Sequence, residues 1–337
     1  MSSKPPCTQR VILIMRILSG IQPSGALHIG NYFGAIRQYI ALQEGNEAYY
    51  FVANYHALTS VRDAGRMRQH VFDVLADLLS LGLDPRKATL FVQSDVPETT
   101  ELAWLLSSVT PMGWLEKCVS FKDKVQQGLP AEHGLFAYPV LQAADILLYD
   151  ADLVPVGQDQ KQHLEITRDI AERFNRVYGG DEDVFRLPKP YILDNVAVVP
   201  GLDGQKMSKS YNNTIEIFDD PATIRKKVKR IVTDSAPVEA PKNPDDSSLF
   251  ALFKLFAPVE ELAEVERRYR EGGIGYGEMK NRLGEAIVQR FAHAREQRAE
   301  WAAHPERIAE VRAAGAARAR ATARKILDRA RAACGVD

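Results

Sequence analysis

Short apolar runs alternate with longer segments of helical periodicity as far as Gly204, and this alternation restricts the fold more than any other feature of the sequence. Strands that alternate with helices predict a parallel β-sheet with helices on both faces. The runs that we interpret as strands are 16–20, 49–53, 89–93 and 153–156. The segments with helical periodicity are 29–44, 64–82, 98–118, 135–149 and 159–178.

Beyond Gly204 the sequence predicts almost only helices, at 221–231, 247–256, 260–271, 276–300 and 304–333. The segment Asp234–Asp246 contains Pro237, Pro241 and Pro244 and is expected to be a flexible connector. We therefore expect an α/β fold, in which a Rossmann-like parallel-sheet domain is followed by an all-helical domain. The expected boundaries are a disordered lead-in at 1–15, the sheet domain at 16–205 and the helical domain at 206–337.

The composition is that of a globular protein, with 45% hydrophobic and 26% charged residues. No apolar run approaches the length needed to cross a bilayer, and the run 11–15 is too short for a signal peptide. We therefore expect a cytoplasmic protein with no membrane partner. Cys7, Cys118 and Cys334 are scattered without ligand spacing, which predicts free thiols and no metal site.

Two basic clusters could each form a local RNA-binding face, although the formal net charge is only −1. The same residues could equally form an ordinary solvated helix surface. The first cluster is Arg225, Lys226, Lys227, Lys229 and Arg230, and the second is Arg307, Arg312, Arg318, Arg320, Arg324, Lys325, Arg329 and Arg331.

The segment 19–31, Ser-Gly-Ile-Gln-Pro-Ser-Gly-Ala-Leu-His-Ile-Gly-Asn, leaves the first expected strand and opens a helix. Its glycines and Pro23 allow the backbone to approach a ligand closely, and the N–H groups at a helix start favour phosphate. The segment contains neither the dinucleotide fingerprint nor a P-loop. An ordinary strand–turn–helix with a capping serine is the alternative interpretation.

The segment 206–210, Lys-Met-Ser-Lys-Ser, follows a turn-rich stretch. Two lysines three positions apart could stabilise the charge that develops on a departing pyrophosphate. Ser208 and Ser210 can donate hydrogen bonds to the same oxygens. A basic surface loop without this function is the simpler alternative.

Asp145 lies in a mainly apolar helical segment, 138–147. A buried carboxylate needs a hydrogen-bond donor, and an indole N–H is a donor only. Asp145 is therefore a candidate acceptor for an indole ring and would reject analogues that lack the N–H. Alternatively, the carboxylate could cap a backbone or bind an arginine.

Taken together, these segments resemble the bacterial-type tryptophanyl-tRNA synthetases, a branch of the class I aminoacyl-tRNA synthetases. The sequence His-Ile-Gly-Asn at 28–31 is similar to the first class I signature, with Asn31 at its last position, and 206–210 matches the second signature, KMSKS. Residues 138–145 and 156–163 resemble two further motifs of the tryptophanyl branch. The resemblance extends from about Leu18 to Phe256, with a weaker helical tail.

The resemblance implies a ligase that activates tryptophan with ATP, releases pyrophosphate and transfers the tryptophan to tRNA(Trp). ATP is then a substrate, Mg²⁺ is carried by the nucleotide, the helical half binds the anticodon and the enzyme is a homodimer. The implied catalytic residues are Lys206, Lys209 and Lys124. The implied ATP contacts are Gln22, Pro23, Ser24, His28, Gly30, Asn31, Gly157, Gln158, Asp159, Val198, Lys206, Met207, Ser208, Lys209 and Ser210. The implied tryptophan contacts are Asp145 at the indole N–H, Tyr138 and Gln160 at the amine and carboxylate, and His56 and Ser19 in the pocket.

Several positions depart from the pattern of this family. Gln142 stands where Met is common, Ser120 where Gln is frequent, Gln158 where Glu is usual and Leu18 where an aromatic is expected, while Asn54-Tyr55 replaces Asp-Gln before His56. These departures affect the pocket and not the class, and they predict either a divergent subgroup or an enzyme with altered sensitivity to substrate analogues. Three alternatives stay open: a tyrosine–tRNA ligase, an RNA-independent nucleotidyltransferase, and an inactive relative that acts as a binding module.

Overall fold

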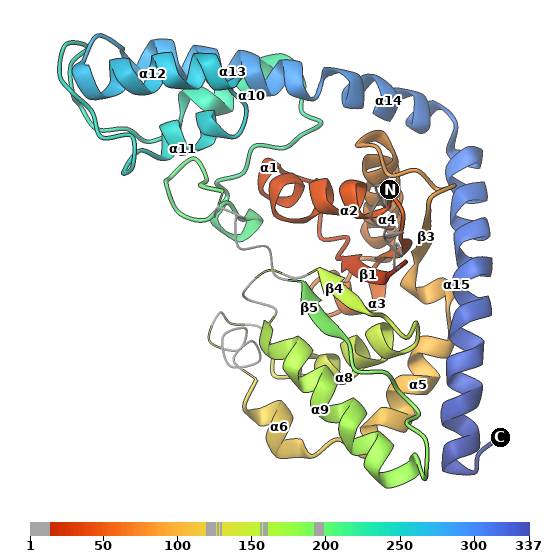
Figure 1. The fold of residues 1–337 in the computed structure, drawn as a ribbon. Coiled ribbons are helices and arrows are strands. Elements are labelled where there is room, and N and C mark those ends of the chain that lie inside the picture. The colour runs from red at the N-terminus through yellow and green to blue at the C-terminus, as the bar shows by residue number, and fades with distance from the viewer. Residues whose placement is uncertain are drawn as a thin grey trace, which may run out of the picture.

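The structure is a computed structural model that describes residues 14–118, 126, 128, 130–155, 157, 161–191 and 199–337. Its centre is a five-stranded parallel sheet with the strand order β3-β2-β1-β4-β5 (Figure 1). The strands are β1 Arg16–Ile21, β2 Glu47–Val52, β3 Ala88–Val92, β4 Leu153–Pro155 and β5 Lys189–Tyr191. This order confirms the expected Rossmann-like sheet. β5 was not predicted, because its short Lys-Pro-Tyr sequence is largely exposed at the sheet edge and lacks strand periodicity.

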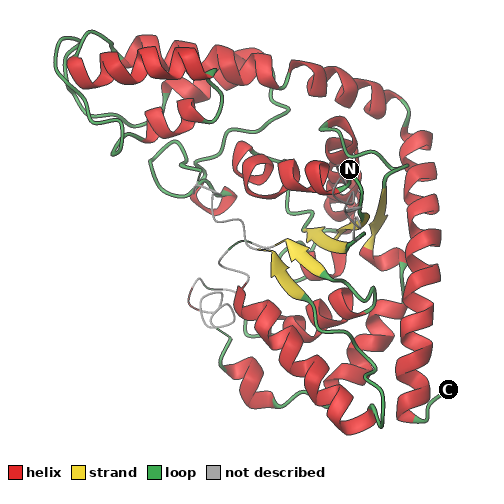
Figure 2. Ribbon diagram, viewed as in Figure 1, coloured by secondary structure: helices red, strands yellow, loops and turns green. Residues whose placement is uncertain are grey.

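The helices account for most of the remaining described chain (Figure 2). In the sheet domain they are α1 Ile29–Asn31, η1 Tyr32–Ile36, α2 Arg37–Leu42, α3 Asn54–Ala57, α4 Ala64–Ser80, η2 Gln93–Asp95, α5 Glu98–Ser107, α6 Met112–Glu116, α8 His133–Leu147 and α9 Lys161–Tyr178. Beyond it they are η4 Lys209–Tyr211, α10 Pro221–Lys229, α11 Ser248–Lys254, α12 Val259–Glu271, α13 Tyr276–Arg290, α14 Ala292–Ala303 and α15 Pro305–Cys334. Within the described residues, every helix is too short or too polar to cross a membrane.

Two expected helices are each divided in the structure. The expected helix 98–118 is wrong as one element, because Pro111 disfavours helical backbone at the residue before it and separates α5 from α6. The expected helix 276–300 is also wrong as one element. Its break falls at Phe291, whose backbone leaves the helical region while its side chain is buried.

The two faces of the sheet pack against separate apolar cores. Tyr50 and Val52 of β2 belong to a core that includes Leu75 of α4. Tyr49 and Phe51, the alternate residues of the same strand, belong to a core that includes helices α5, α8 and α9. The two-residue period of a strand therefore places helices on both faces, as expected for a parallel sheet.

The helix that follows the first motif contains a wide π turn. The expected helix 29–44 is present, but its middle section η1 is a π-helix between α1 and α2. Phe33 of η1 packs edge to face on Phe256 with ring centroids 5.2 Å apart, and Tyr32 packs on Phe291 at 5.0 Å. These ring contacts join η1 to the helical region. Because π turns are frequent at functional sites, η1 is expected to lie near the active site.

The helical region after residue 206 has two parts (Figure 1). Helices α10 to α13 form an arm that extends away from the sheet, and α14 leads back from it. The long helix α15 then lies along β3 and α5 of the sheet domain. Its Gly315 is pressed against β3, because a Cβ at this position would lie 1.7 Å from the carbonyl oxygen of Leu90.

The arginines of α15 are largely engaged with the sheet domain. Arg312 donates two hydrogen bonds to Asp95 at 2.6 and 2.7 Å. Arg320 and Arg324 both contact Glu98, whose side chain is only 4% exposed. Arg318, Arg329 and Arg331 contact the Pro85 carbonyl, Asp150 and Glu101, respectively. The second basic cluster therefore attaches α15 to the sheet domain more than it forms a free cationic face.

The segment Asp234–Asp246 is tied down, which contradicts the expectation of a flexible connector. Lys242 is buried, and its Nζ donates to the carbonyl oxygens of Pro237 at 2.8 Å and Ala240 at 2.9 Å. Its backbone N–H donates to the Tyr269 carbonyl of α12 at 2.6 Å. The ammonium group folds the loop back on its own carbonyl groups, and the contact with Tyr269 joins the loop to α12; the prolines in the sequence indicate neither contact.

Candidate active site

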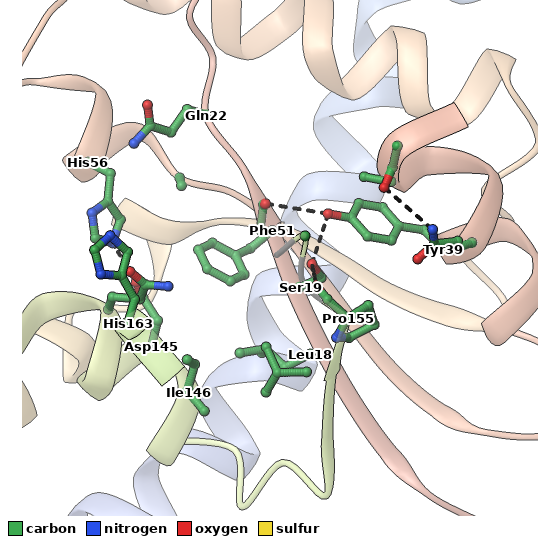
Figure 3. A pocket seen from close by; sticks show the side chains of 18 of the residues that line it. Leu18, Ser19, Gln22, Tyr39, Phe51, His56, Asp145, Ile146, Pro155 and His163 are labelled. Atoms are coloured by element: carbon green, nitrogen blue, oxygen red, sulfur yellow. Dashed lines mark hydrogen bonds and ion pairs between the residues drawn. The ribbon is translucent and has the colours of Figure 1, made fainter. Parts of the chain in front are cut away.

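A cavity of about 480 Å³ lies at the carboxyl ends of β1 and β4 (Figure 3). Ligands of open parallel sheets bind at such a place, where the strand order reverses. The volume is also typical of small-molecule sites, which run from about 300 to 1,000 Å³. The cavity is lined by Leu18, Ser19, Gly20, Gln22, Gly34, Ala35, Gln38, Tyr39, Phe51, Ala53, His56, Tyr138, Gln142, Asp145, Ile146, Val154, Pro155, Gly157 and His163.

Asp145 is the buried carboxylate of this cavity. It lies on α8 and is 3% exposed. The Nε2 atom of Gln93 lies 2.8 Å from both of its oxygens, and Nε2 of His56 lies 2.8 Å from Oδ2. Burial raises the pKa of Asp145, whereas the hydrogen bonds from His56 and Gln93 lower it. The partners are thus neither a helix cap nor an arginine, the two alternatives that the sequence left open.

The walls beside Asp145 are apolar and flat. Phe51 of β2 stacks on Phe91 of β3 with an interplanar angle of 25°. Gly20 of β1 allows the Phe51 ring its place, because a Cβ on residue 20 would lie 2.5 Å from that ring. Figure 3 shows Leu18 and Ile146 below Phe51, between Asp145 and Pro155. A planar apolar ligand with one hydrogen-bond donor would match this arrangement.

Polar side chains at other points of the cavity are held by neighbours. Tyr138 Oη lies 2.7 Å from Nε2 of His163. Ser19 Oγ donates to Tyr39 Oη at 2.8 Å, which places a hydroxyl pair across the cavity from His56 (Figure 3). The expected tryptophan contacts Ser19, His56, Tyr138 and Asp145 are therefore brought together in one cavity.

The first motif extends from the cavity to the second motif, 206–210. Gln22 lines the cavity at the end of β1. His28 is 6% exposed, and among the described residues its Nδ1 has no hydrogen-bond partner. Burial and, to a smaller extent, the nearby charge of Lys209 together lower the pKa of His28 to about 4. The Oδ1 atom of Asn31 accepts from the backbone N–H of His28 at 3.0 Å, so Asn31 closes the first helical turn.

The two motifs are in direct contact. Lys209 Nζ donates to the Gly25 carbonyl at 2.9 Å and lies 3.4 Å from Ser24 Oγ. Where the two motifs meet, residue 30 must be glycine, because a Cβ there would lie 2.9 Å from Nδ1 of His28 and 3.4 Å from Cβ of Met207. Two phosphate-binding candidates that are far apart in sequence therefore form one site next to the cavity.

Backbone and side-chain hydrogen bonds fix the loop that carries the lysines. The N–H of Ile29 donates to the Ile215 carbonyl, and the N–H of Ile217 donates to the Leu27 carbonyl, each at 3.0 Å. The buried Asn213 accepts from the Ser208 N–H at 2.8 Å and donates to Asp203 at 2.7 Å. Lys206 is exposed, whereas burial lowers the pKa of the partly enclosed Lys209.

Some expected site residues lie outside the described residues. They are Lys124, Ser120, Gln158, Asp159, Gln160 and Val198. Gly157, itself one of the expected ATP contacts, is described and lines the cavity. Among the departures from the family pattern, Gln142 and Leu18 line the cavity, whereas Asn54 exchanges hydrogen bonds with Ser94.

Sequence reasoning missed several residues of the site. Gln93, His163 and Tyr39 each hold a cavity side chain in place. For Gln93 there was a usable signal, since it is the first polar residue after β3, at the sheet edge where parallel strands present their ligands. Tyr39 and His163 are on helices, where their periodicity suggested only packing.

Comparisons with known proteins agree with this geometry. The sequence profile described as tRNA synthetases class I (W and Y) matches residues 14–292. A tryptophan–tRNA ligase of Rhodopirellula baltica is 55% identical over 322 residues, which cover 96% of this chain and 100% of the relative. A tryptophan–tRNA ligase of Fusobacterium nucleatum is 49% identical over 321 residues, covering 95% and 98%. The crystal structure of tryptophanyl-tRNA synthetase from Campylobacter jejuni complexed with ADP and tryptophan has a TM-score of 0.89 at 48% identity, covering 95% of this chain and 100% of that one.

Proposed function

The chain belongs to the class I tRNA synthetases for tryptophan and tyrosine, and we propose that it activates tryptophan with ATP and transfers the tryptophan to its tRNA. This is the reaction of the tryptophan–tRNA ligases that match nearly the whole chain. The family, the fold class and the enzyme class predicted from the sequence are thereby confirmed. The observation that carries the placement of tryptophan is the buried Asp145 carboxylate beside the flat apolar walls of the cavity.

Tryptophan fits the cavity with its ring at Asp145. The indole lies against Phe51 and Ile146, and its N–H donates to the Asp145 carboxylate. Tyr138 and Gln160 bind the amine and carboxylate, with His56 and Ser19 completing the pocket. A tyrosine side chain would leave part of the apolar wall without contact, and burial of an apolar side chain is worth about 1.5–3 kcal/mol. The tyrosine–tRNA ligase alternative is disfavoured for this reason and by the identity of the relatives.

ATP binds where the two motifs meet. Its contacts are Gln22, Pro23, Ser24, His28, Gly30, Asn31, Gly157, Gln158, Asp159, the backbone at Val198, and 206–210. Mg²⁺ arrives on the nucleotide as part of the substrate. The phosphate oxygens of the nucleotide would hold the ion in this proposal. Among the described residues no group of three or more His, Cys, Asp or Glu side chains could hold a metal ion.

Activation needs no nucleophile from the protein. The tryptophan carboxylate is already ionised at neutral pH and attacks the α-phosphorus. A bond forms between the carboxylate oxygen and the α-phosphorus, and the bond from the α-phosphorus to the bridging oxygen of the β-phosphate breaks, which releases pyrophosphate. Lys206, Lys209 and Lys124 stabilise the charge on the phosphate oxygens. Lys209 must exchange its contacts with Gly25 and Ser24 for phosphate, and this short movement suits a loop lysine.

Transfer to tRNA uses the arm. A terminal ribose hydroxyl of the tRNA attacks the carbonyl carbon of the adenylate and AMP leaves. The exposed Lys226, Lys229 and Arg230 of the first basic cluster lie at the end of α10 on the arm and remain available for phosphate. Arg225 and Lys227 are instead paired with Glu285 and with Glu216 and Asp219. The proposed domain division, with the sheet domain at 16–205 and the tRNA-binding region at 206–337, places α15 in the second part by sequence although it packs on the first.

The enzyme acts as a cytoplasmic homodimer in this proposal. Trp104 of α5 is 76% exposed and Met112 at the start of the neighbouring α6 is 62% exposed. Large apolar side chains of this kind are enriched at the centres of protein interfaces. We assign this face to the second copy of the chain.

The decisive test is tryptophan-dependent exchange of pyrophosphate into ATP, with tyrosine measured in parallel. The parent is expected to exchange with tryptophan and not with tyrosine. Lys209→Ala lowers the exchange rate by about 100-fold or more, as expected for loss of a transition-state charge contact, and leaves tryptophan binding measured by calorimetry nearly unchanged. Lys226→Ala, an exposed lysine on the arm, serves as the control and exchanges like the parent. Equal rates for Lys209→Ala and the parent would refute the role of the loop.

A further inference from the structure

Gln93 is a fully buried polar residue at the end of β3 that the proposed reaction does not use. It is 0% exposed and belongs to η2. It is not among the residues that line the cavity, so it does not touch a ligand there. Its side chain nevertheless contacts Asp145, the residue on which recognition of tryptophan depends.

The orientation of the Gln93 amide is fixed by its other contact. Oε1 of Gln93 accepts from the backbone N–H of Tyr55 at 3.0 Å. A backbone N–H can only donate, so the amide oxygen must face Tyr55 and the NH₂ group must face Asp145. The NH₂ group can only donate in turn, and its nitrogen lies 2.8 Å from each carboxylate oxygen. This geometry suits an ionised carboxylate, which accepts at both oxygens.

The contacts of Asp145 leave one of its oxygens less occupied than the other. Oδ2 accepts from both Gln93 and His56, whereas Oδ1 accepts from Gln93 alone. A carboxylate has about four acceptor sites. With Oδ2 saturated by two donors, the open acceptor site is on Oδ1.

We propose that Gln93 is a positioning residue that holds Asp145 ionised and turned so that Oδ1 receives the ring N–H of tryptophan. The inference rests on the proposed function and adds the atom of recognition and the residue that orients it. His56 donates through Nε2 to Oδ2 and acts as the second support. Both supports come from the carboxyl-terminal side of neighbouring strands, since His56 follows β2 and Gln93 follows β3.

The test compares tryptophan with 3-(benzothiophen-3-yl)alanine, in which sulfur replaces the ring N–H. The parent is expected to prefer tryptophan strongly in kcat/KM for pyrophosphate exchange. Gln93→Met removes the donor at similar volume and lowers this preference by about 10- to 100-fold, the range of one hydrogen bond to a charged group. The loss appears mainly in KM for tryptophan, while kcat at saturating tryptophan stays within a few-fold of the parent.

Gln43→Met is the matched control. Gln43 is also buried, and it also makes two side-chain hydrogen bonds, to the Gly82 carbonyl and from the Asp84 N–H, but it lies away from the cavity. It is expected to lower stability and to leave the preference between the two amino acids unchanged. A purely structural role of Gln93 would make the two variants alike.

The outcomes separate this inference from the proposed function. If the parent shows no tryptophan-dependent exchange, the proposed function fails. If the parent is active and Gln93→Met keeps the full preference for tryptophan, the role of Gln93 is overturned. Should Gln93→Met not fold, Gln93→Glu gives the same test, because two facing carboxyl groups cannot both be ionised and one oxygen of Asp145 is then engaged by a proton. Its preference for tryptophan is expected to fall, and an unchanged preference would again overturn the inference.

Discussion

Gly315→Ala tests the packing of α15 on the sheet, because two physical effects predict opposite signs. Gly315 is buried in the interior of a 30-residue helix. In an unconstrained helix, alanine is more favourable than glycine by about 1 kcal/mol. At this position, however, the new Cβ would lie 1.7 Å from the carbonyl oxygen of Leu90 and 2.7 Å from its carbonyl carbon. The obstacle is the backbone of β3, which cannot rotate away as a side chain would.

The steric effect should exceed the gain in helix propensity. Relief of the contact requires α15 and β3 to separate by more than 1 Å, since carbon and oxygen atoms in contact are about 3.3 Å apart. Ala319 and Ala323 bury the next two turns of α15 and oppose that movement. Overpacking of a core costs about 1–3 kcal/mol, occasionally more. With the upper value and the propensity gain subtracted, we expect a net loss of about 2 kcal/mol.

The assay is urea unfolding followed by circular dichroism, with Gly284→Ala as the matched control. Gly284 is likewise buried within a helix, but a Cβ there meets only the Arg225 side chain and Cα at 3.6 Å or more. The control should be as stable as the parent or up to about 1 kcal/mol more stable. If Gly315→Ala unfolds at the same urea concentration as the parent or at a higher one, the close contact between α15 and β3 is refuted.

Two further predictions concern the buried, neutral His28 and the ion pairs of the basic clusters. Burial lowers the pKa of His28 from 6.5 to about 4, so its stabilising contribution is complete above pH 6.5 and is lost as the pH falls toward 4. Between pH 7 and pH 5 the parent should therefore lose about 2 kcal/mol more unfolding free energy than His28→Gln, and equal losses in urea titrations would contradict the buried, unprotonated ring. Lys229→Glu should raise KM for tRNA severalfold in aminoacylation, whereas Arg320→Gln, which removes a contact with the buried Glu98, should lower the melting temperature and leave KM for tRNA unchanged. If Arg320→Gln raised KM for tRNA and Lys229→Glu did not, the RNA-binding face would lie on α15 and not on the arm.

The sequence was sufficient for the features that depend on local pattern. Apolar runs of β1, β2 and β3 identified the sheet, and the helical periodicity of 64–82 and 159–178 identified α4 and α9. Asp145 was predicted to be a buried hydrogen-bond acceptor, because the residues next to it in the sequence are apolar. Its position in a cavity with Ser19 and Tyr138 agrees with this interpretation.

Features that depend on distant pairing were not accessible. The arginines of α15 look like a cationic surface until the sheet domain supplies Asp95, Glu98 and Glu101, residues more than 200 positions away. The break at Phe291 is also tertiary, since it follows from the packing of that ring on Tyr32. Local periodicity contains no information about which surface a side chain will meet.

The π turn η1 makes the number of residues in this helix a constraint of its own. Its Gly34 and Ala35 line the cavity, while Tyr32 packs on Phe291 at the base of the arm. A π turn holds an extra residue relative to an α-helix, so conversion of η1 to α-helix would absorb a deletion of one residue and leave Tyr39 facing Ser19. A further insertion, by contrast, would rotate all later positions by about 100°. Tyr39 would then turn away from Ser19. Natural variation between Asn31 and Tyr39 should accordingly tolerate loss of a single residue and exclude insertions.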